Sequence, residues 1–276
     1  MVKLIAGQVA VVTGGASGIG FALCEQFAQR GLDVVISDID EAALASAAEQ
    51  LVGQPGRVLT VPTDVTDPEA VDRLAARTLE HFGRVDVVCN NAGTVGKNMP
   101  LWEFEHVEWK WLLGVDMWGV IHGISSFVPH LVSQGSGHVI NTASMAGIAS
   151  VPLNGPYNAA KHAVVSISET LALDLAERGV DVGVTVLCPG PTLTRLMTDG
   201  PRDRPAHLRP KADRGVDPRS NPGTFAASTG QLAQASEVAQ ATVAAVEEGR
   251  FLLAPHPGSR DRFDQRIERW RADLTG

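Results

Sequence analysis

The chain has 276 residues, of which 44% are apolar and 20% are charged, a balance typical of a globular protein. Its 31 acidic residues outnumber the 23 basic ones, and the net charge of −8 argues against nucleic acid or an anionic membrane as a partner. No apolar run has the length of a membrane span, the N-terminus has no apolar leader, and the three cysteines lie far apart, so we expect a cytoplasmic protein. The eight histidines show no metal-ligand spacing, and we expect no metal site.

Short runs of β-branched residues alternate with amphipathic stretches along most of the chain. Strands are predicted at residues 8–12, 33–38, 57–61, 85–90, 137–142, 181–188 and 250–254. Helices are predicted at residues 19–30, 41–51, 68–82, about 105–131, 157–178 and 236–248. Alternating strands and helices make right-handed crossovers. We therefore expect an α/β fold in a single domain, residues 1–276, with a doubly wound (Rossmann) parallel sheet of about seven strands and helices on both faces.

A glycine-rich turn joins the first predicted strand to the first predicted helix. Residues 13–20 read Thr-Gly-Gly-Ala-Ser-Gly-Ile-Gly. Glycines at 14, 18 and 20 let the turn tighten, let a pyrophosphate lie against the backbone, and let the helix pack on the strand. Many such turns carry glycine for backbone reasons alone, but this position in the chain favours a dinucleotide site.

Asp38 ends the second predicted strand, where a carboxylate can accept hydrogen bonds from both hydroxyls of an adenosine ribose. The alternative role, a helix cap, suits Asp40 better. A 2′-phosphate would bring a charge of roughly −2 against Asp38, and no Arg or Lys stands at Ser17, Ser37 or Ile39 to offset it. The sequence therefore predicts NAD rather than NADP as cofactor.

Further motifs follow the later strands in a fixed order. They are Asp64-Val65, Asn90-Asn91-Ala92-Gly93, Ser144, Tyr157-x-x-x-Lys161 and Pro189-Gly190-Pro191-Thr192-Leu193-Thr194. With the T-G-x-x-x-G-I-G turn at residues 13–20, this series resembles the short-chain dehydrogenase/reductase superfamily. The resemblance covers essentially residues 7–254.

The resemblance implies one site for cofactor and substrate. It assigns cofactor binding to Gly14, Ser17, Gly18, Ile19, Gly20, Asp38, Asp64, Val65, Asn91, Ala92, Gly93, Tyr157, Lys161, Pro189, Gly190, Thr192 and Thr194. It assigns catalysis to Ser144, Tyr157 and Lys161, with Ser144 holding the substrate oxygen.

Tyr157 is the only tyrosine in the chain, and Lys161 lies four residues later on the same helix face. A free tyrosine has a pKa of about 10, so a tyrosine base that works near neutrality needs a lowered pKa. We expect the Lys161 ammonium and an oxidised nicotinamide to lower it together. Tyr157 would then take the alcohol proton while the nicotinamide takes a hydride.

One position departs from the family pattern. Where the family usually has Asn in an N-x-x-G motif, this chain has Asp116-Met117-Trp118-Gly119. The family resemblance implies a water at this Asn that links the lysine to solvent. Asp116 can also accept a hydrogen bond from such a water, so we predict it as a fourth catalytic residue, in the proton relay. It adds a negative charge near Tyr157 and Lys161. The alternative is a polar position on a half-exposed helix.

Residues 191–230 show little periodicity, and we predict a substrate lid there, followed by a C-terminal tail at 255–276. The segment has seven basic residues (Arg195, Arg202, Arg204, Arg209, Lys211, Arg214, Arg219) and four acidic ones (Asp199, Asp203, Asp213, Asp217). Arg195 would pair with a carboxylate or phosphate of the substrate. A solvated loop whose charges only keep it soluble is equally compatible with this composition.

Four tryptophans between residues 102 and 118 (Trp102, Trp109, Trp111, Trp118) are expected in the core or a subunit interface rather than around a substrate. Cys188 is expected to be a small buried hydrophobe. The resemblance also implies a homo-oligomer, a dimer or tetramer.

The predicted function is an NAD-dependent oxidoreductase acting on a secondary alcohol or ketone. The sparse charge around Met145, Ile148 and Val151 favours a largely apolar small molecule. One alternative is a catalytically silent NAD-binding or scaffold protein on the same fold. A sugar-nucleotide epimerase or dehydratase is a third possibility, but those enzymes resemble a longer relative with a C-terminal substrate domain.

Overall fold

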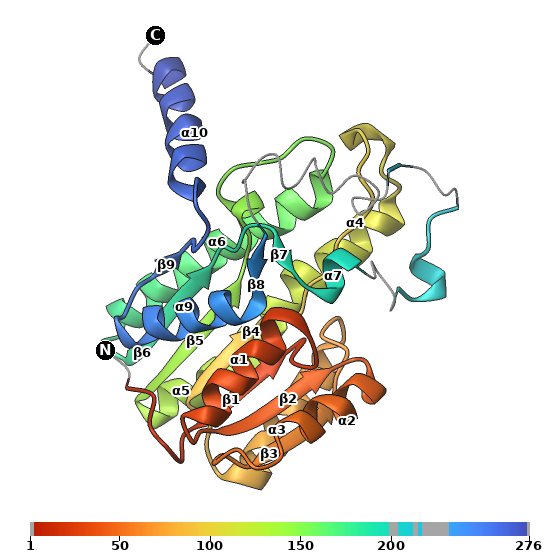
Figure 1. Ribbon diagram of the computed structural model, residues 1–276. Coiled ribbons are helices and arrows are strands. Elements are labelled where there is room, and N and C mark those ends of the chain that lie inside the picture. The colour runs from red at the N-terminus through yellow and green to blue at the C-terminus, as the bar shows by residue number, and fades with distance from the viewer. Residues whose placement is uncertain (1–2, 199–203, 212–214, 217–231, 275–276) are drawn as a thin grey trace.

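A computed structural model describes residues 3–198, 204–211, 215–216 and 232–274. Its centre is a sheet of seven parallel strands in the order β3-β2-β1-β4-β5-β6-β9 (Figure 1). The strands are β1 (Val9–Thr13), β2 (Asp33–Asp38), β3 (Val58–Pro62), β4 (Val87–Asn90), β5 (Ser136–Thr142), β6 (Asp181–Leu187) and β9 (Leu252–Leu253). The predicted doubly wound parallel sheet is confirmed.

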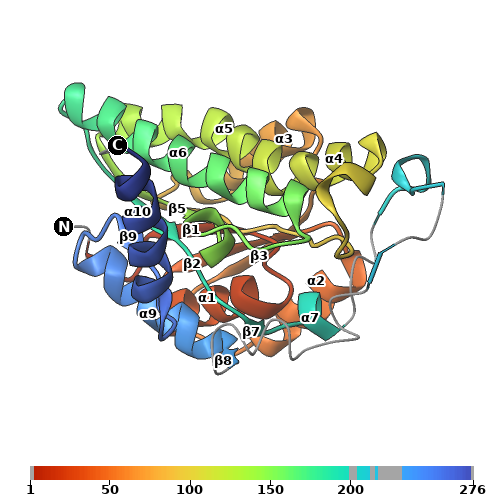
Figure 2. The same ribbon diagram turned by 90° about the horizontal axis from the view of Figure 1, so that it is seen from above.

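Helices cover both faces of this sheet. They are α1 (Gly18–Gln29), α2 (Glu41–Gln50), α3 (Pro68–Phe82), α4 (His106–Leu113), α5 (Gly119–Gln134), α6 (Gly155–Glu177) and α9 (Ala235–Glu247). Figure 2 shows α1, α2 and α9 on one face and α3, α5 and α6 on the other. Each face has its own apolar core, with Phe27 fully buried in one and Phe127 in the other. The strands read as nearly continuous apolar runs because both of their faces are covered.

The stretch predicted as one helix at about 105–131 contains a π-helical turn, η2 (Gly114–Trp118), between α4 and α5. A π turn inserts an extra residue into a helix and is frequent at functional sites. The 29 residues His106–Gln134 are long and apolar enough by composition to cross a membrane. They pack instead beside α3 and α6 (Figure 2), and this packing accounts for their apolar side chains.

The chain after β6 forms short elements and one longer helix. They are β7 (Thr192–Leu193), α7 (Arg195–Thr198), the 3₁₀ turn η4 (Ala206–Leu208), β8 (Ala233–Gln234) and α10 (Ser259–Leu274). Strands β7 and β8 pair with each other. Most of the predicted lid, residues 199–203, 212–214 and 217–230 with the charged residues Arg202, Arg214, Arg219, Asp199, Asp203, Asp213 and Asp217, lies outside the described residues.

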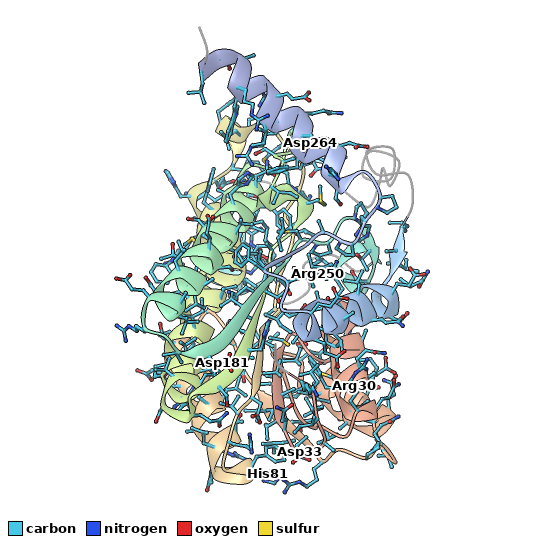
Figure 3. The ribbon with its side chains drawn as sticks, turned by 90° about the vertical axis from the view of Figure 1, so that its left-hand side faces the viewer. Arg30, Asp33, His81, Asp181, Arg250 and Asp264 are labelled. Atoms are coloured by element: carbon cyan, nitrogen blue, oxygen red, sulfur yellow. The ribbon has the colours of Figure 1, made fainter. Side chains whose placement is uncertain are left out.

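Residues 255–276, for which the sequence pattern suggests only a tail, contain the 16-residue helix α10. In Figure 3, Asp264 on α10 lies at the end of the molecule opposite Asp33, the first residue of β2. Because all seven strands run in the same direction, α10 therefore stands at the carboxyl end of the sheet, where ligands bind in open α/β folds.

Candidate active site

One cavity of about 340 Å³ opens at the carboxyl ends of the strands. All the residues predicted to bind cofactor or to catalyse line it, with the single exception of Gly20. The sequence motifs, which are spread over 180 residues from Gly14 to Thr194, therefore form one site.

The glycine turn has the shape of a phosphate cradle. Gly14 and Gly18 have φ values of +60° and +56°, in the left-handed region that glycine adopts without strain. A Cβ on Gly14 would come within 2.8 Å of the Ala92 backbone, and one on Gly20 within 2.1 Å of the Gly14 carbonyl oxygen. Gly20 therefore allows α1 to pack closely against the turn at Gly14. Gly14 and Gly18 line the cavity beside the N-terminus of α1.

Asp38 lies at the far end of the same cavity. One of its carboxylate oxygens accepts a hydrogen bond from the Ala16 amide and the other from the Asp40 amide, both at 3.2 Å. Burial raises the pKa of Asp38, and these backbone amides partly counter the effect. Asp40 caps α2 through the Ala43 amide at 3.0 Å, as expected, so Asp38 is left to face a ligand.

The Asn-Asn-Ala-Gly turn ties the ends of three strands together. The Thr13 hydroxyl accepts from the backbone amides of Asn91 and Ala92 at 3.0 and 3.1 Å. The Asn91 side chain donates to the Thr13 carbonyl at 3.0 Å and accepts from the Thr142 hydroxyl at 3.2 Å. Thr13 is thus a positioning residue that the motif assignments above do not include, although a hydroxyl at the last position of β1 is a signal for it.

The predicted catalytic residues lie together at the end of β5 and the start of α6. The Ser144 hydroxyl accepts from the Ala146 amide at 3.1 Å, and its interaction with the Tyr157 phenol lowers the Tyr157 pKa. The Lys161 ammonium lies 5.6 Å from the centre of the Tyr157 ring. It donates to the Thr142 carbonyl at 3.0 Å.

Asp116 is fully buried and forms an ion pair with Lys161, with 3.0 Å between Oδ1 and Nζ. Oδ1 also accepts from the Thr94 amide at 3.1 Å, and Oδ2 has no partner among the described residues. The alternative of a polar position on a half-exposed helix is therefore wrong. Asp116 instead pairs directly with the lysine. Gly93 leaves room for this carboxylate, because a Cβ on Gly93 would lie 3.0 Å from Oδ1.

This buried pair changes the expected electrostatics of Tyr157. Burial raises the pKa of Tyr157. The Lys161 charge and the Ser144 hydroxyl lower this pKa, and the Asp116 charge raises it. The net direction is upward, so the residues alone do not produce the lowered pKa expected from Lys161. For Lys161 itself, burial opposes the charged form, but Asp116 and Tyr157 outweigh it and the pKa is raised.

The loop Pro189–Thr194 is held by a residue that the sequence analysis missed. His256, which is 5% exposed, accepts from the Gly190 amide at 2.9 Å through Nδ1, and its Nε2 donates to the Pro191 carbonyl at 3.0 Å. These partners require the neutral ring, and burial lowers the His256 pKa. A Cβ on Gly190 would touch the ring at 2.8 Å, a close approach that sequence spacing cannot show.

One expectation about this region is corrected. The Arg195 guanidinium lies 3.8 Å from an Asp40 carboxylate oxygen, beside the β2–α2 turn rather than the substrate end. Trp111 is buried in the core as expected, and it also lines the cavity. Trp102 is 85% exposed, and Cys188 is buried as expected.

The cavity also has an apolar end beyond Ser144 and Tyr157. Its remaining lining includes Val95, Asn98, Trp111, Val115, Met145, Val151, Asn154, Leu196, Pro205, Leu208 and Arg262. Four of these residues follow Thr194 in the chain, where the sequence offers no periodic pattern.

A glycine-cradled dinucleotide cavity that contains a serine, a tyrosine and a lysine defines a nicotinamide-dependent oxidoreductase acting on CH–OH groups. The family model described as short chain dehydrogenase matches residues 8–205. The chain belongs to the short-chain dehydrogenase family.

Named relatives and a solved structure agree with this assignment. The chain is 41% identical over 192 residues to 1-deoxy-11-beta-hydroxypentalenate dehydrogenase of Streptomyces exfoliatus, covering 69% of each protein. It is 33% identical to 3beta-hydroxysteroid dehydrogenase 2 of Eggerthella lenta, covering 70% of this chain and 74% of the relative. A short chain dehydrogenase/reductase from Burkholderia phymatum, solved in complex with NAD, matches with a TM-score of 0.92 and 38% identity over 99% of this chain and 97% of that one.

Proposed function

We propose that this enzyme interconverts a largely apolar secondary alcohol and its ketone with NAD as the preferred cofactor. The observation that carries this proposal is the meeting of Ser144, Tyr157 and Lys161 in the same cavity as Asp38 and the glycine turn. The names of the two relatives, a hydroxypentalenate and a hydroxysteroid dehydrogenase, support a carbocyclic alcohol as substrate.

Each residue has a defined task in this reaction. The glycine turn, Asp38 and Lys161 would hold the dinucleotide, and its nicotinamide ring would supply the chemistry of hydride transfer to and from the carbinol carbon. Ser144 holds the substrate oxygen, and Tyr157 takes the alcohol proton in oxidation and donates it in reduction. Lys161 stabilises the phenolate and binds the nicotinamide ribose, while Asp116 acts as a positioning residue that fixes the ammonium.

Tests with a panel of secondary alcohols address this proposal directly. Purified full-length protein with NAD and either 2-octanol, cyclohexanol or a 3-hydroxysteroid is expected to produce NADH, measured by absorbance. NADH binding without turnover on any alcohol would instead support the silent binding protein on the same fold.

Asp38 is proposed to set the cofactor preference. A phosphate at about 4 Å from this carboxylate costs on the order of 4 kcal/mol per unit charge at an effective dielectric constant of about 20. The solved relative with bound NAD supports the same choice.

We expect at least a tenfold preference for NAD over NADP in kcat/KM, equivalent to about 1.4 kcal/mol, and we expect Asp38→Asn to narrow it. Asp67→Asn is the matched control, because Asn caps a helix as well as Asp and Asp67 caps α3 outside the cavity lining. Equal kcat/KM for the two cofactors in the wild type would contradict the assignment.

We further propose a homo-oligomer that works in the cytoplasm. The exposed Trp118 and Leu173, 49% and 66% exposed on the helical layer that contains α5 and α6, supply apolar surface for a second copy. The three cysteines are unpaired and buried, which suits a reducing compartment. Light scattering of the purified protein measures its molar mass in solution. The mass of a single chain would contradict the proposed homo-oligomer.

A further inference from the structure

Two arginines one turn apart on α10 have different surroundings. Arg266 donates to the Ile148 carbonyl at 2.6 Å, lies 2.8 Å from Nε2 of His162, and stacks on Trp270. Arg262 is half-buried and lines the cavity. Among the described residues, its guanidinium has no hydrogen bond or ion pair.

The contacts on either side of Arg262 place it at the substrate end of the cavity. His256 ties the chain just before α10 to Gly190 and Pro191. Arg266 ties the second turn of α10 to Ile148, which follows the 3₁₀ turn η3 (Met145–Gly147) directly after Ser144. Residues four apart share one helix face, so Arg262 lies on the anchored face between these two attachments. It is therefore near Ser144 and not near Asp38.

The described part of the cavity lining offers this arginine no unpaired anion at its own end. The carboxylates among the described lining residues are Asp38, Asp40 and Asp64, which surround the adenosine end, and Asp116, which is paired with Lys161. The lining that follows Ser144 in the chain begins with the apolar residues Met145, Ala146 and Val151. A cation that lines an apolar cavity needs a partner to offset its desolvation.

A second arginine of this region, Arg204, is not among the residues that line the cavity. It stacks on Trp111 at 4.7 Å and donates to the Leu208 carbonyl. Its Nη2 atom is buried and has no hydrogen-bond partner among the described residues, but the carboxylates of Glu105 and Glu108 act on its charge. Arg262 differs because it lines the cavity itself.

We infer that the substrate carries an anionic group remote from its carbinol carbon and that Arg262 binds it, making Arg262 a residue that determines substrate specificity. A carboxylate fits best, because the planar guanidinium can donate two parallel hydrogen bonds to it. The apolar body of the substrate would then span the distance from Ser144 to the first turn of α10. This inference rests on the proposed function, because it assumes that the substrate occupies this end of the cavity.

Keto acids and their methyl esters test the inference by binding alone. Holoenzyme saturated with NAD cannot reduce a ketone, so calorimetry measures affinity without turnover. The probes are the linear 9-oxodecanoate and the polycyclic 3-oxocholanoate, each compared with its methyl ester. At least one acid is expected to bind about tenfold or more tightly than its ester, and Arg262→Gln is expected to abolish that difference while leaving the affinity for the ester unchanged.

Arg260→Gln is the matched control, because Arg260 lies on the same helix, is 91% exposed and pairs with Asp264. It is expected to keep the preference for the acid, and Arg262→Lys is expected to keep part of it. The inference would be overturned if the wild type bound neither acid, or bound neither acid more tightly than its ester. A preference for the acid that survives in Arg262→Gln would also overturn it. The alcohol panel reports the proposed function separately, because neutral alcohols do not need Arg262.

Discussion

Replacing Tyr157 by Phe is expected to lower kcat for alcohol oxidation by about a thousandfold or more, within the range that general acid–base catalysis contributes. The substitution removes one phenolic oxygen and keeps the ring. Ser144 keeps the hydrogen bond from the Ala146 amide, and the contacts of Lys161 to Thr142 and Asp116 also remain. Binding of NADH is therefore expected to persist, and fluorescence titration measures it.

Ser144→Ala is the companion variant. It leaves the phenol in place, so its loss of kcat is expected to be smaller than that of Tyr157→Phe. If Tyr157→Phe kept more than a few per cent of wild-type turnover, another group would have to move the proton.

Asp116 gives the second large effect, and the two substitutions Asp116→Leu and Asp116→Asn separate its roles. Leu leaves the Lys161 ammonium buried without its partner, and breaking a buried pair in this way costs about 3–5 kcal/mol of folding stability. Chemical denaturation measures that loss. A loss below about 1 kcal/mol would show that the pair does not hold the site together.

Asn keeps the shape of the side chain and removes the charge. The charged and titratable groups acting on Tyr157 are Lys161, Asp116 and Cys188, and the Asp116 charge raises its pKa. Asp116→Asn is therefore expected to lower the Tyr157 pKa and move the acid limb of the kcat profile for oxidation to lower pH. An unchanged profile would contradict this role.

Tyr157 is the only tyrosine, so tyrosinate absorbance reports its ionisation without interference from other tyrosines. Asp72→Asn is the control, because Asp72 accepts a hydrogen bond from Ser126 outside the cavity lining.

The Lys161–Asp116 pair also makes the folding stability depend on pH. The pKa of Lys161 is raised above 10.5, its ordinary value, so its contribution is complete below that pH and is lost as pH rises through the folded-state pKa. Without the Asp116 charge the Lys161 pKa falls. The alkaline loss of stability is then expected to begin at lower pH in Asp116→Asn than in the wild type.

Local patterns predicted most of the fold. The strands β2 and β5 were placed within a residue of their observed ends, because β-branched runs covered on both faces have little ambiguity. Helix α3 has the predicted bounds: it begins after its Asp67 cap and ends before Gly83, whose φ is +76°. Gly14, Asp38 and Ser144 lie where they were expected, since turns after parallel strands all open at one edge of the sheet.

The contacts that were missed depend on tertiary distance or on helix rotation. The π turn sets which way Asp116 points, and no periodicity in residues 105–131 indicates that extra residue. His256 reaches Gly190 across 66 residues of sequence. Arg195 directly follows the loop near the nicotinamide, yet it turns toward Asp40. Sequence proximity to the chemistry therefore did not decide which arginine faces the substrate end.

Two different stretches of the chain supply the catalytic residues and the proposed specificity residue on α10. The residues proposed to move the proton, from Asp116 to Lys161, lie inside the segment that matches the family model, residues 8–205. Arg262 and its anchors His256 and Arg266 lie well beyond it. Mutations in the codons for residues 256–266 can therefore change which substrate is recognised without altering the residues that move the proton. A duplicated copy of the gene then has a short route to a new metabolic role.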